Sequence, residues 1–499
     1  MKARLPELSY LAFLALFLFA KGIGLYDGQP LFRAVLVLAV LCYGVKMLTT
    51  KYSVREMTII GGLLALSAVN YYISGEKSAL LYVMMVTGMK NISRERIFRV
   101  ALLTWTMSFG GMFLLTAAHI LDSPFKVHEK FGLGPLLRWG LGQPHPNVLH
   151  ISYLTFAMLF IYVYTYQGKK VSLWTLALLM LGNVYVFLYS LSSTGLVAVS
   201  VLLFLNLYWY FRQKFSLAEK ILVSSFLPLC LLLSFAAPLL LTGRAFDLVN
   251  RIVNWRLFQA RHFLTGTAPS LFGTQLSAIT DTHYTMDNSF VFAYVAYGIV
   301  MFALIMAAYF LLIHRFLKAG KGVELSLVIA ALTAGLTEPF LFNGSFKNVT
   351  LLFLGALLYG ECQAKPLPEL PAIIPKLTAK PRRLIFIPLA AALLGAVLCG
   401  LLQTKPEGYI IPRSETILDG EREAYYLASA DEWAGQNIKV LGYVNPETRM
   451  VLFAEDNLIV LEWWRGVVTA GLLTGLVSLA IVLIRVRIEQ CFLNDRGRT

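Results

Sequence analysis

Residues 288–313 read NSFVFAYVAYGIVMFALIMAAYFLLI, a run that contains no charged side chain. As an α-helix it would be about 39 Å long, which exceeds the roughly 30 Å thickness of the hydrocarbon core of a bilayer. The sequence therefore predicts an all-α polytopic membrane protein with about 14 transmembrane helices. The other apolar runs lie at 8–26, 31–48, 57–74, 78–89, 98–120, 147–166, 172–190, 195–211, 221–241, 324–342, 348–360, 384–403 and 464–485.

The overall composition agrees with this class of protein. Hydrophobic residues make up 58% of the chain and charged residues 14%, which lies outside the range of soluble globular proteins. Most of the cations fall in short gaps between apolar runs, on the side that we predict to be cytoplasmic, so we do not expect nucleic acid as a partner. The five cysteines have no paired spacing, and we expect no disulfide, no metal site and no cofactor.

The distribution of lysine and arginine predicts the orientation of the chain. With Lys2 and Arg4 inside, the short basic gaps all fall on the cytoplasmic side, and both termini are predicted to be cytoplasmic. The long polar segments 122–147, 242–287 and 404–463 are then outside. Two of these outer segments are rich in Arg and His, on the side where such residues are disfavoured, which suggests an anionic ligand.

Composition also divides the chain into domains. Residues 1–360 form the main transmembrane domain, and a proline-rich segment, 361–383, is predicted to be a cytoplasmic linker because it holds too many prolines for a helix. Residues 384–485 form a unit of two helices around the outer segment 404–463, followed by a cytoplasmic tail, 486–499.

The outer segment 404–463 differs from the other two because it carries more acids than bases. Residues 438–444 and 450–453, on either side of Asn445-Pro446, predict a β-hairpin. Residues 424–433 could form a short helix. We therefore expect a small α+β segment that is not part of a site for an anionic ligand.

The second outer segment, 242–287, has the densest cationic pattern. Arg244, Asp247 and Arg251 have the i, i+3, i+7 spacing that places side chains on one face of a helix. One interpretation is an amphipathic helix lying on anionic lipid headgroups. The other is a set of arginines that converge on a diphosphate, whose oxygens accept bidentate hydrogen bonds from guanidinium groups. The further candidate residues of this segment are Arg256, Arg261, His262 and His283.

The first outer segment ends at the entrance of an apolar run, in Pro144-His145-Pro146-Asn147. A histidine held between two prolines could act as a general base near neutral pH. Alternatively, His145 and Asn147 cap the next helix. Near the outer end of another run, Glu338 is an ionisable group at a depth where such groups are candidates for function, although a pairing of Glu338 with Lys347 explains it equally well.

Three short motifs resemble those of a known family. They are Arg138 with Gly142 and His145-Pro146-Asn147; Leu241-Thr242-Gly243-Arg244; and Tyr284-Thr285-Met286-Asp287-Asn288-Ser289-Phe290 followed by Tyr297-Gly298-Ile299. In this order they resemble the motifs of bacterial Wzy-type polysaccharide polymerases, within the superfamily of O-antigen ligases and polymerases. The resemblance covers residues 1–360.

The resemblance implies a metal-independent glycosyltransferase of the bacterial plasma membrane, which builds an exopolysaccharide or capsule of the cell envelope. Its substrate would be an undecaprenyl-diphosphate-linked oligosaccharide, and membrane lipids and a flippase or chain-length regulator of the same pathway would be its other partners. Arg138, Arg244, Arg251, Arg256 and Arg261 would bind the diphosphate, with Asn147, His262, His283 and Asn288 as further substrate-binding candidates.

For catalysis, we predict Asp287 and His145. A carboxylate such as Asp287 can position the acceptor hydroxyl, although Asp287-Asn288 could equally be the N-cap of the following helix. Related ligases carry His-Asn or His-Ser at this place, and this difference favours a polymerase over a ligase. A ligase, a lipid-linked oligosaccharide flippase and a structural subunit of an envelope complex remain alternatives.

Overall fold

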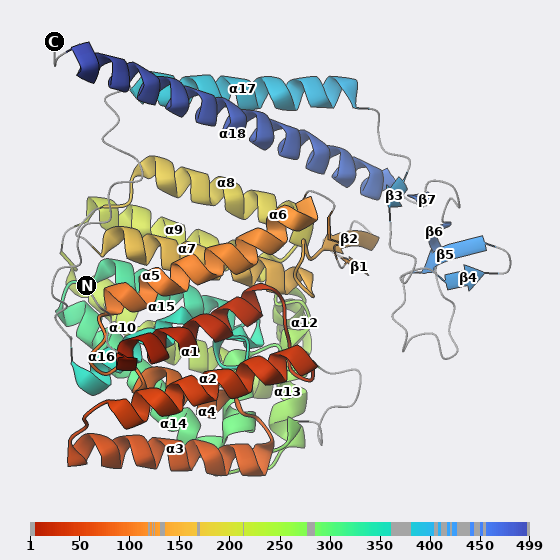
Figure 1. Ribbon diagram of the computed structural model, residues 1–499. Coiled ribbons are helices and arrows are strands. Elements are labelled where there is room, and N and C mark those ends of the chain that lie inside the picture. The colour runs from red at the N-terminus through yellow and green to blue at the C-terminus, as the bar shows by residue number, and fades with distance from the viewer. Residues whose placement is uncertain are drawn as a thin grey trace. The chain divides into compact units, whose positions relative to one another are not determined.

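Most of the chain is helical, with little sheet, in the computed structural model (Figure 1). Ten of the described helices are long and apolar enough to cross a membrane, which confirms a membrane-embedded helical protein. Four shorter apolar helices, Ser78–Thr87, Gly322–Gly335, Val349–Tyr359 and Phe386–Leu402, coincide with four of the predicted runs. The structure describes residues 5–117, 120–121, 123, 125–129, 135–166, 170–212, 214–276, 285–360, 381–403, 408–410, 417–419, 422–426, 440–443, 450–452 and 456–496.

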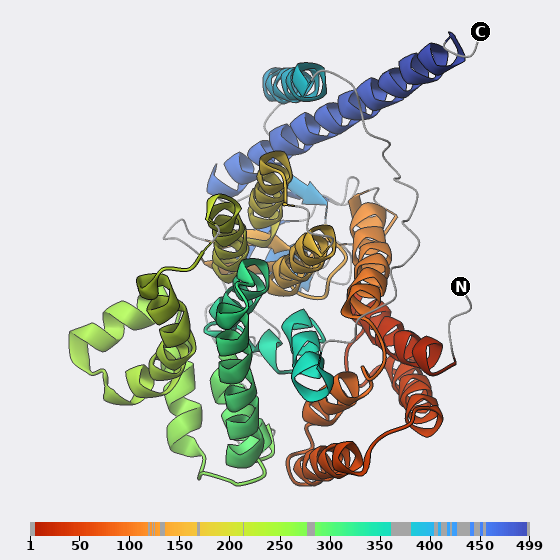
Figure 2. The ribbon, with the colours of Figure 1, turned by 90° about the vertical axis from the view of Figure 1, so that its left-hand side faces the viewer.

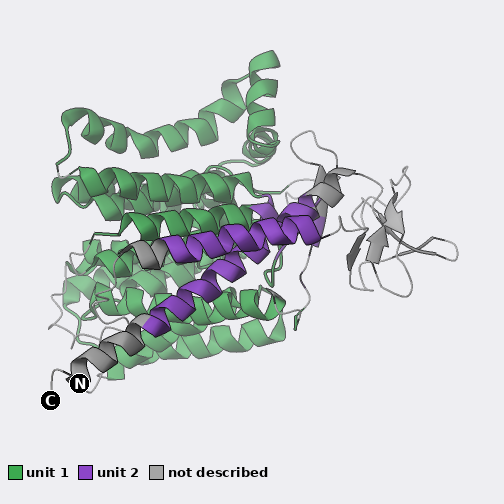
Figure 3. Cartoon of the chain, turned by 90° about the horizontal axis from the view of Figure 1, so that it is seen from above, with its two compact units in different colours: residues 1–121, 141–187, 192–364 green, residues 122–140, 188–191, 365–499 purple. Residues whose placement is uncertain are grey.

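The chain divides into two compact units, shown in different colours in Figure 3. Unit 1 contains residues 1–121, 141–187 and 192–364, and unit 2 contains residues 122–140, 188–191 and 365–499. Unit 2 thus includes two short stretches that precede the proline-rich segment in the sequence.

Unit 1 begins with α1 (Leu5–Gly22), α2 (Pro30–Thr49), α3 (Val54–Ser74), α4 (Ser78–Thr87), α5 (Arg94–Trp105), the π-helical η1 (Thr106–Gly110) and α6 (Gly111–Ala117). It continues with α7 (Pro146–Thr165), α8 (Leu173–Ser190), α9 (Ser193–Phe211), α10 (Leu217–Leu231), the π-helical η2 (Leu232–Ala236) and α11 (Ala237–Leu240). The last elements are α12 (Gly243–Ile252), α13 (Arg256–Gly266), α14 (Ser289–Lys318), α15 (Gly322–Gly335), η4 (Pro339–Leu341), η5 (Val349–Phe353) and α16 (Leu354–Tyr359). Helices α1, α2, α3, α5, α7 and α9 run along roughly the same axis in Figure 1 and are seen close to end-on in Figure 2.

Several helix starts in unit 1 follow from local sequence. Ser53 and Ser216 each accept a hydrogen bond from the backbone N–H three residues on, and Glu56 and Glu219 bond back to complete a capping box. The core between the helices combines aliphatic and aromatic side chains, and the rings of Phe17 and Phe346 stack with centroids 4.5 Å apart.

Helix α14 is interrupted at Gly298, where the backbone has φ +74°. The break leaves a carbonyl and an N–H of the helix free to bond the segment 270–274: the N–H of Thr274 donates to the carbonyl of Val295 (2.9 Å), and the N–H of Ile299 donates to the carbonyl of Ser270 (2.9 Å). Asn70 on α3 joins the same place by donating to the carbonyl of Ala296 (3.0 Å). The Tyr297-Gly298-Ile299 motif is therefore the position where the segment 270–274 packs into a broken helix.

Unit 2 contains two helices, α17 (Pro381–Leu402) and α18 (Asp456–Arg496), which pack through small residues. The hydroxyl of Thr474 donates to the carbonyl of Ala391 (3.1 Å), and a Cβ at Gly475 would lie 2.9 Å from the Cβ of Ala392. The strands are β1 (Phe125–Glu129), β2 (Pro135–Trp139), β3 (Gly408–Ile410), β4 (Ile417–Asp419), β5 (Arg422–Tyr426), β6 (Val440–Tyr443) and β7 (Met450–Leu452).

The strands pair in three small antiparallel sheets. Strand β1 pairs with β2, β3 pairs with β7, and β5 lies between β4 and β6. The strands predicted at 438–444 and 450–453 are present, but they pair with β5 and β3, so the predicted hairpin between them is wrong. Residues 424–426, predicted as the start of a short helix, belong to β5, and residues 427–433 lie outside the described residues. A turn motif specifies that the chain reverses but not which strands then pair.

Candidate functional site

A buried arginine lies between two carboxylates at the start of α13. The preceding residues, Asn254 and Trp255, have φ of +54° and +66°, which ends α12 and turns the chain into α13. Arg256 places its Nη2 atom 2.8 Å from Oε1 of Glu338 and 3.8 Å from Oδ2 of Asp287. Its Nε donates to the carbonyl of Thr337. The side chain is 11% exposed, so these ion pairs are only partly screened by water.

Glu338 is the most buried member of this cluster. Its side chain is 4% exposed, and Oε1 also accepts a hydrogen bond from Nδ2 of Asn147 at 2.7 Å. The carbonyl oxygen of Glu338 accepts a hydrogen bond from the hydroxyl of Ser289 at 2.5 Å. The alternative pairing with Lys347 is wrong, because Lys347 forms no ion pair with any described residue and Glu338 binds Arg256 instead.

Asn147 connects the cluster to the entrance of α7. Its backbone N–H donates to Nδ1 of His145 at 3.1 Å, which makes His145 the N-cap of α7. The capping interpretation of His145 is therefore confirmed. Asn147 has a different role from the predicted one of a cap, because its side chain is turned to Glu338.

The sequence left open whether Asp287-Asn288 caps the next helix or takes part in catalysis. In the structure the two residues have different contacts. The cap of α14 is Asn288, whose Oδ1 accepts hydrogen bonds from the backbone of Phe290 (2.9 Å) and Val291 (3.0 Å). The side chain of Asp287, which is 28% exposed, faces Arg256 instead. Burial raises the pKa of the Asp287 carboxyl above its usual value, although the charge of Arg256 and a hydrogen bond from Thr285 act in the opposite direction.

The predicted amphipathic helix is two helices, α12 and α13, joined by a hydrogen bond from the backbone N–H of Phe258 to Oδ1 of Asn250 (3.0 Å). Arg244 and Arg251 are exposed on α12 and form no ion pair with the described residues. They are therefore accessible to an anionic ligand or to lipid headgroups.

The guanidinium of Arg261 contacts backbone carbonyls and an aromatic ring. Its Nε donates to the carbonyl of Pro238 (2.5 Å), and its Nη2 donates to the carbonyl of Leu241. The guanidinium also lies 3.9 Å from the centroid of the Phe246 ring. Arg261 thus satisfies the carbonyl groups at the end of α11, and its predicted role in diphosphate binding is not supported by its contacts.

Of the two remaining candidate histidines, the structure describes one. His262 lies on α13, with its ring edge-on to Phe263 at 5.4 Å between centroids. His283 lies outside the described residues.

Arg138 belongs to unit 2. It lies on β2, is 5% exposed, and donates from Nε to the carbonyl of Ser190 at 2.8 Å.

Sequence reasoning gave Glu338 less weight than the structure does. The signal was present, since an acid beside a proline at the end of an apolar run is uncommon unless it is paired. Thr337 and Thr194, whose hydroxyl oxygens are 2.7 Å apart, adjoin this position and were not predicted as a pair.

Comparison of the chain with models of protein families, with curated proteins and with solved structures found no match. The chemistry of the site must therefore be argued from its own residues. A carboxylate with a raised pKa beside an arginine can accept a proton, and exposed arginines can hold an anion.

Proposed function

We propose that this protein is a glycosyltransferase that polymerises polyprenyl-diphosphate-linked oligosaccharide repeat units at the outer face of the bacterial plasma membrane. The proposed topology has fourteen spans and both termini in the cytoplasm. The product would be an exopolysaccharide or capsule of the cell envelope. The observation that carries the proposal is the position of Arg256 between Asp287 and Glu338, with two exposed arginines on the preceding helix, α12.

The reaction follows from the residues. The hydroxyl of the acceptor sugar attacks the anomeric carbon of the donor, the bond from that carbon to the diphosphate oxygen breaks, and polyprenyl diphosphate leaves. Asp287 would accept the proton of the hydroxyl. Arg244 and Arg251 would stabilise the charge that develops on the leaving diphosphate, to which guanidinium groups are well matched.

Arg256 has a positioning role in this proposal. Because its guanidinium is already bound to Glu338, it is less available for a diphosphate than the exposed arginines of α12. It lies beside the carboxylate of Asp287, and its charge favours the ionised form of that group against the effect of burial. Asn147 holds Glu338 from the other side.

The test uses a strain in which the gene is deleted, with lipid-linked intermediates extracted and assigned to a membrane face. A polymerase predicts single undecaprenyl-diphosphate repeat units on the outer face and no polymer. A flippase predicts the same units on the inner face, and a ligase predicts polymer that stays attached to the lipid. Either of the last two results would reject the proposal.

A further inference from the structure

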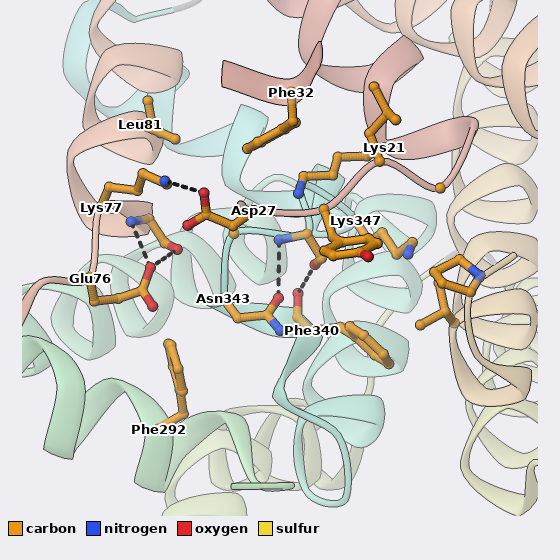
Figure 4. Close-up of a pocket in the computed structure, with 18 residues that line it drawn as sticks. Lys21, Asp27, Phe32, Glu76, Lys77, Leu81, Phe292, Phe340, Asn343 and Lys347 are labelled. Carbon is orange, nitrogen blue, oxygen red and sulfur yellow. Dashed lines mark hydrogen bonds and ion pairs between the residues drawn. The ribbon is translucent and has the colours of Figure 1, made fainter. Parts of the chain in front are cut away.

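A second cationic cavity lies in unit 1, apart from the Arg256 cluster. Its volume is about 360 Å³, and it is bounded by the end of α1, the loop before α2, the start of α4, the start of α7 and the segment between η4 and η5 (Figure 4). The described residues that line this cavity do not include Arg256, Asp287, Glu338 or Asn147. The charged residues that line it are Lys21, Asp27, Glu76, Lys77 and Lys347.

The two acids of this cavity, Asp27 and Glu76, bind other partners and form no ion pair with Lys21 or Lys347. Asp27 binds Nζ of Lys77 at 2.6 Å, and Glu76 accepts a hydrogen bond from the backbone N–H of Ser78 at 3.0 Å. Neither Lys21 nor Lys347 forms an ion pair with any residue that the structure describes. Three lysines and two acids line the cavity, which therefore has an excess of one positive charge.

Aromatic faces are what these two lysines contact instead. Nζ of Lys21 lies 4.0 Å from the centroid of Phe32, and Nζ of Lys347 lies 5.3 Å from that of Phe340. A cation–π contact is weaker than an ion pair with a carboxylate and does not replace the water lost on burial. Lys347 is only 5% exposed, so its charge is costly unless an anion lies beside it.

The electrostatics of Lys347 reflect this cost. Burial, and then the like charge of Lys21, lower the pKa of Lys347 to about 7. The two ammonium groups therefore lie close enough to repel each other. An anion placed in the cavity would attract both, and would raise the pKa of Lys347 towards its usual value.

The size and walls of the cavity narrow the class of anion. A water molecule takes up about 30 Å³ of liquid, so about 360 Å³ holds a phosphate or diphosphate together with several waters. Lysine is a common phosphate ligand, acting as a point charge. Phe32, Leu81 and Phe292 line other parts of the wall, which suits an apolar chain attached to the anion (Figure 4).

We propose that Lys21 and Lys347 form a second binding site, for the phosphate group of a lipid. Two sources share this chemistry: the diphosphate of a second lipid-linked substrate, and the headgroup of an anionic phospholipid. The first source rests on the proposed function, because polymerisation needs a lipid-linked acceptor as well as a donor. The phosphate site itself does not depend on it.

The experiment uses the full-length protein in nanodiscs of phosphatidylcholine, with farnesyl diphosphate as the probe and binding followed by ³¹P NMR titration. Lys21→Gln and Lys347→Gln should each weaken binding about tenfold or more, the effect expected when one charged contact is lost. Lys51→Gln, which removes the same charge from an exposed position, should leave this binding unchanged. If Lys347→Gln does not fold, Lys347→Met takes its place in the experiment, because methionine removes the charge without leaving a polar group buried.

Nanodiscs that contain phosphatidylglycerol separate the two sources. If that lipid displaces the probe from the wild type and copurifies with it but not with Lys347→Met, the site holds a phospholipid. If the probe binds equally well with and without phosphatidylglycerol, the site holds a lipid diphosphate. If both lysine variants bind the probe and phosphatidylglycerol as tightly as the wild type does, Lys21 and Lys347 do not form a phosphate site. Absence of polymer from purified repeat units, with binding intact, would overturn the proposed function and leave the site standing.

Discussion

Arg465 donates a hydrogen bond from its guanidinium to the carbonyl of Leu137, at 2.8 Å, across 328 positions of the sequence. The same side chain, 1% exposed, donates from Nε to the carbonyl of Leu188 at 2.9 Å. Arg138 follows Leu137 directly on β2 and binds Ser190. One arginine of α18 thus holds both the strand that carries Arg138 and the stretch to which Arg138 is bonded.

This relationship predicts that Arg465→Gln lowers the stability of unit 2. Loss of the guanidinium leaves the buried carbonyls of Leu137 and Leu188 with fewer donors, at a cost of about 1–3 kcal/mol. We therefore expect a lower melting temperature for Arg465→Gln, measured on the full-length protein in nanodiscs. As a control, Lys51→Gln removes a cation from an exposed position and should melt as the wild type does. An unchanged melting temperature in Arg465→Gln would show that these hydrogen bonds do not stabilise the protein.

Asp287→Asn should abolish most activity and spare the fold. The cap of α14 is Asn288, so the substitution removes no capping hydrogen bond, while it removes the group that would accept a proton. Loss of a general base typically lowers the rate by about 10²–10⁴. The measurement is polymer formed from purified lipid-linked repeat units, with Asp247→Asn, an exposed acid of α12, as the matched control. Full activity in Asp287→Asn would leave Glu338 and His145 as the groups to test.

The ion pair between Arg256 and Asp287 predicts a shift in the pH profile. Burial raises the pKa of Asp287 and Arg256 lowers it, so removing the guanidinium in Arg256→Gln should raise that pKa further. The active form of a base is the ionised one, which is lost as pH falls through its pKa. The acid limb of the pH–rate profile should therefore move to higher pH in Arg256→Gln, and an unmoved limb would separate Asp287 from proton transfer.

The arginines of α12 and α13 should respond differently to the same change. Arg244→Lys keeps the charge of an exposed residue but loses the planar fork, so we expect it to reduce activity nearly as much as Arg244→Ala, with unchanged stability. Arg261→Lys should instead lower thermal stability, because one ammonium cannot replace the contacts to Pro238 and Leu241. Thermal melts and polymer assays of both variants provide the comparison. A fully active Arg244→Lys would remove the diphosphate role.

The parts of this molecule that depend on local sequence could be predicted, and those that depend on distant contacts could not. An uncharged run such as 288–313 has to form a helix in a bilayer, because its backbone groups have no other partners there. The break at Gly298 within that helix depends on residues 270–274, which approach it only in the folded chain.

The candidate site shows the same division. Position at the mouth of an apolar run marked Asp287 and Asn147, but the partner of Glu338 lies 82 residues away on another element. The nearer Lys347 was a reasonable partner by sequence distance and is not the one observed. Among the arginines, type and spacing alone could not separate the exposed Arg244 from Arg261, whose donors are used by backbone carbonyls.

The last prediction concerns Lys347, whose folded pKa of about 7 lies well below the usual value of 10.5. Between these two pH values the unfolded chain binds more protons than the folded one, so this residue makes stability rise as pH increases from about 7 towards 10.5. Lys347→Met removes both the buried charge and this dependence. In nanodiscs without anionic lipid, we expect the variant to melt at a higher temperature than the wild type at pH 7, with the difference shrinking towards pH 10. The other charged groups that line the cavity, Lys21, Asp27, Glu76 and Lys77, are present in both proteins. A difference that does not change with pH would mean that Lys347 keeps its proton throughout this range.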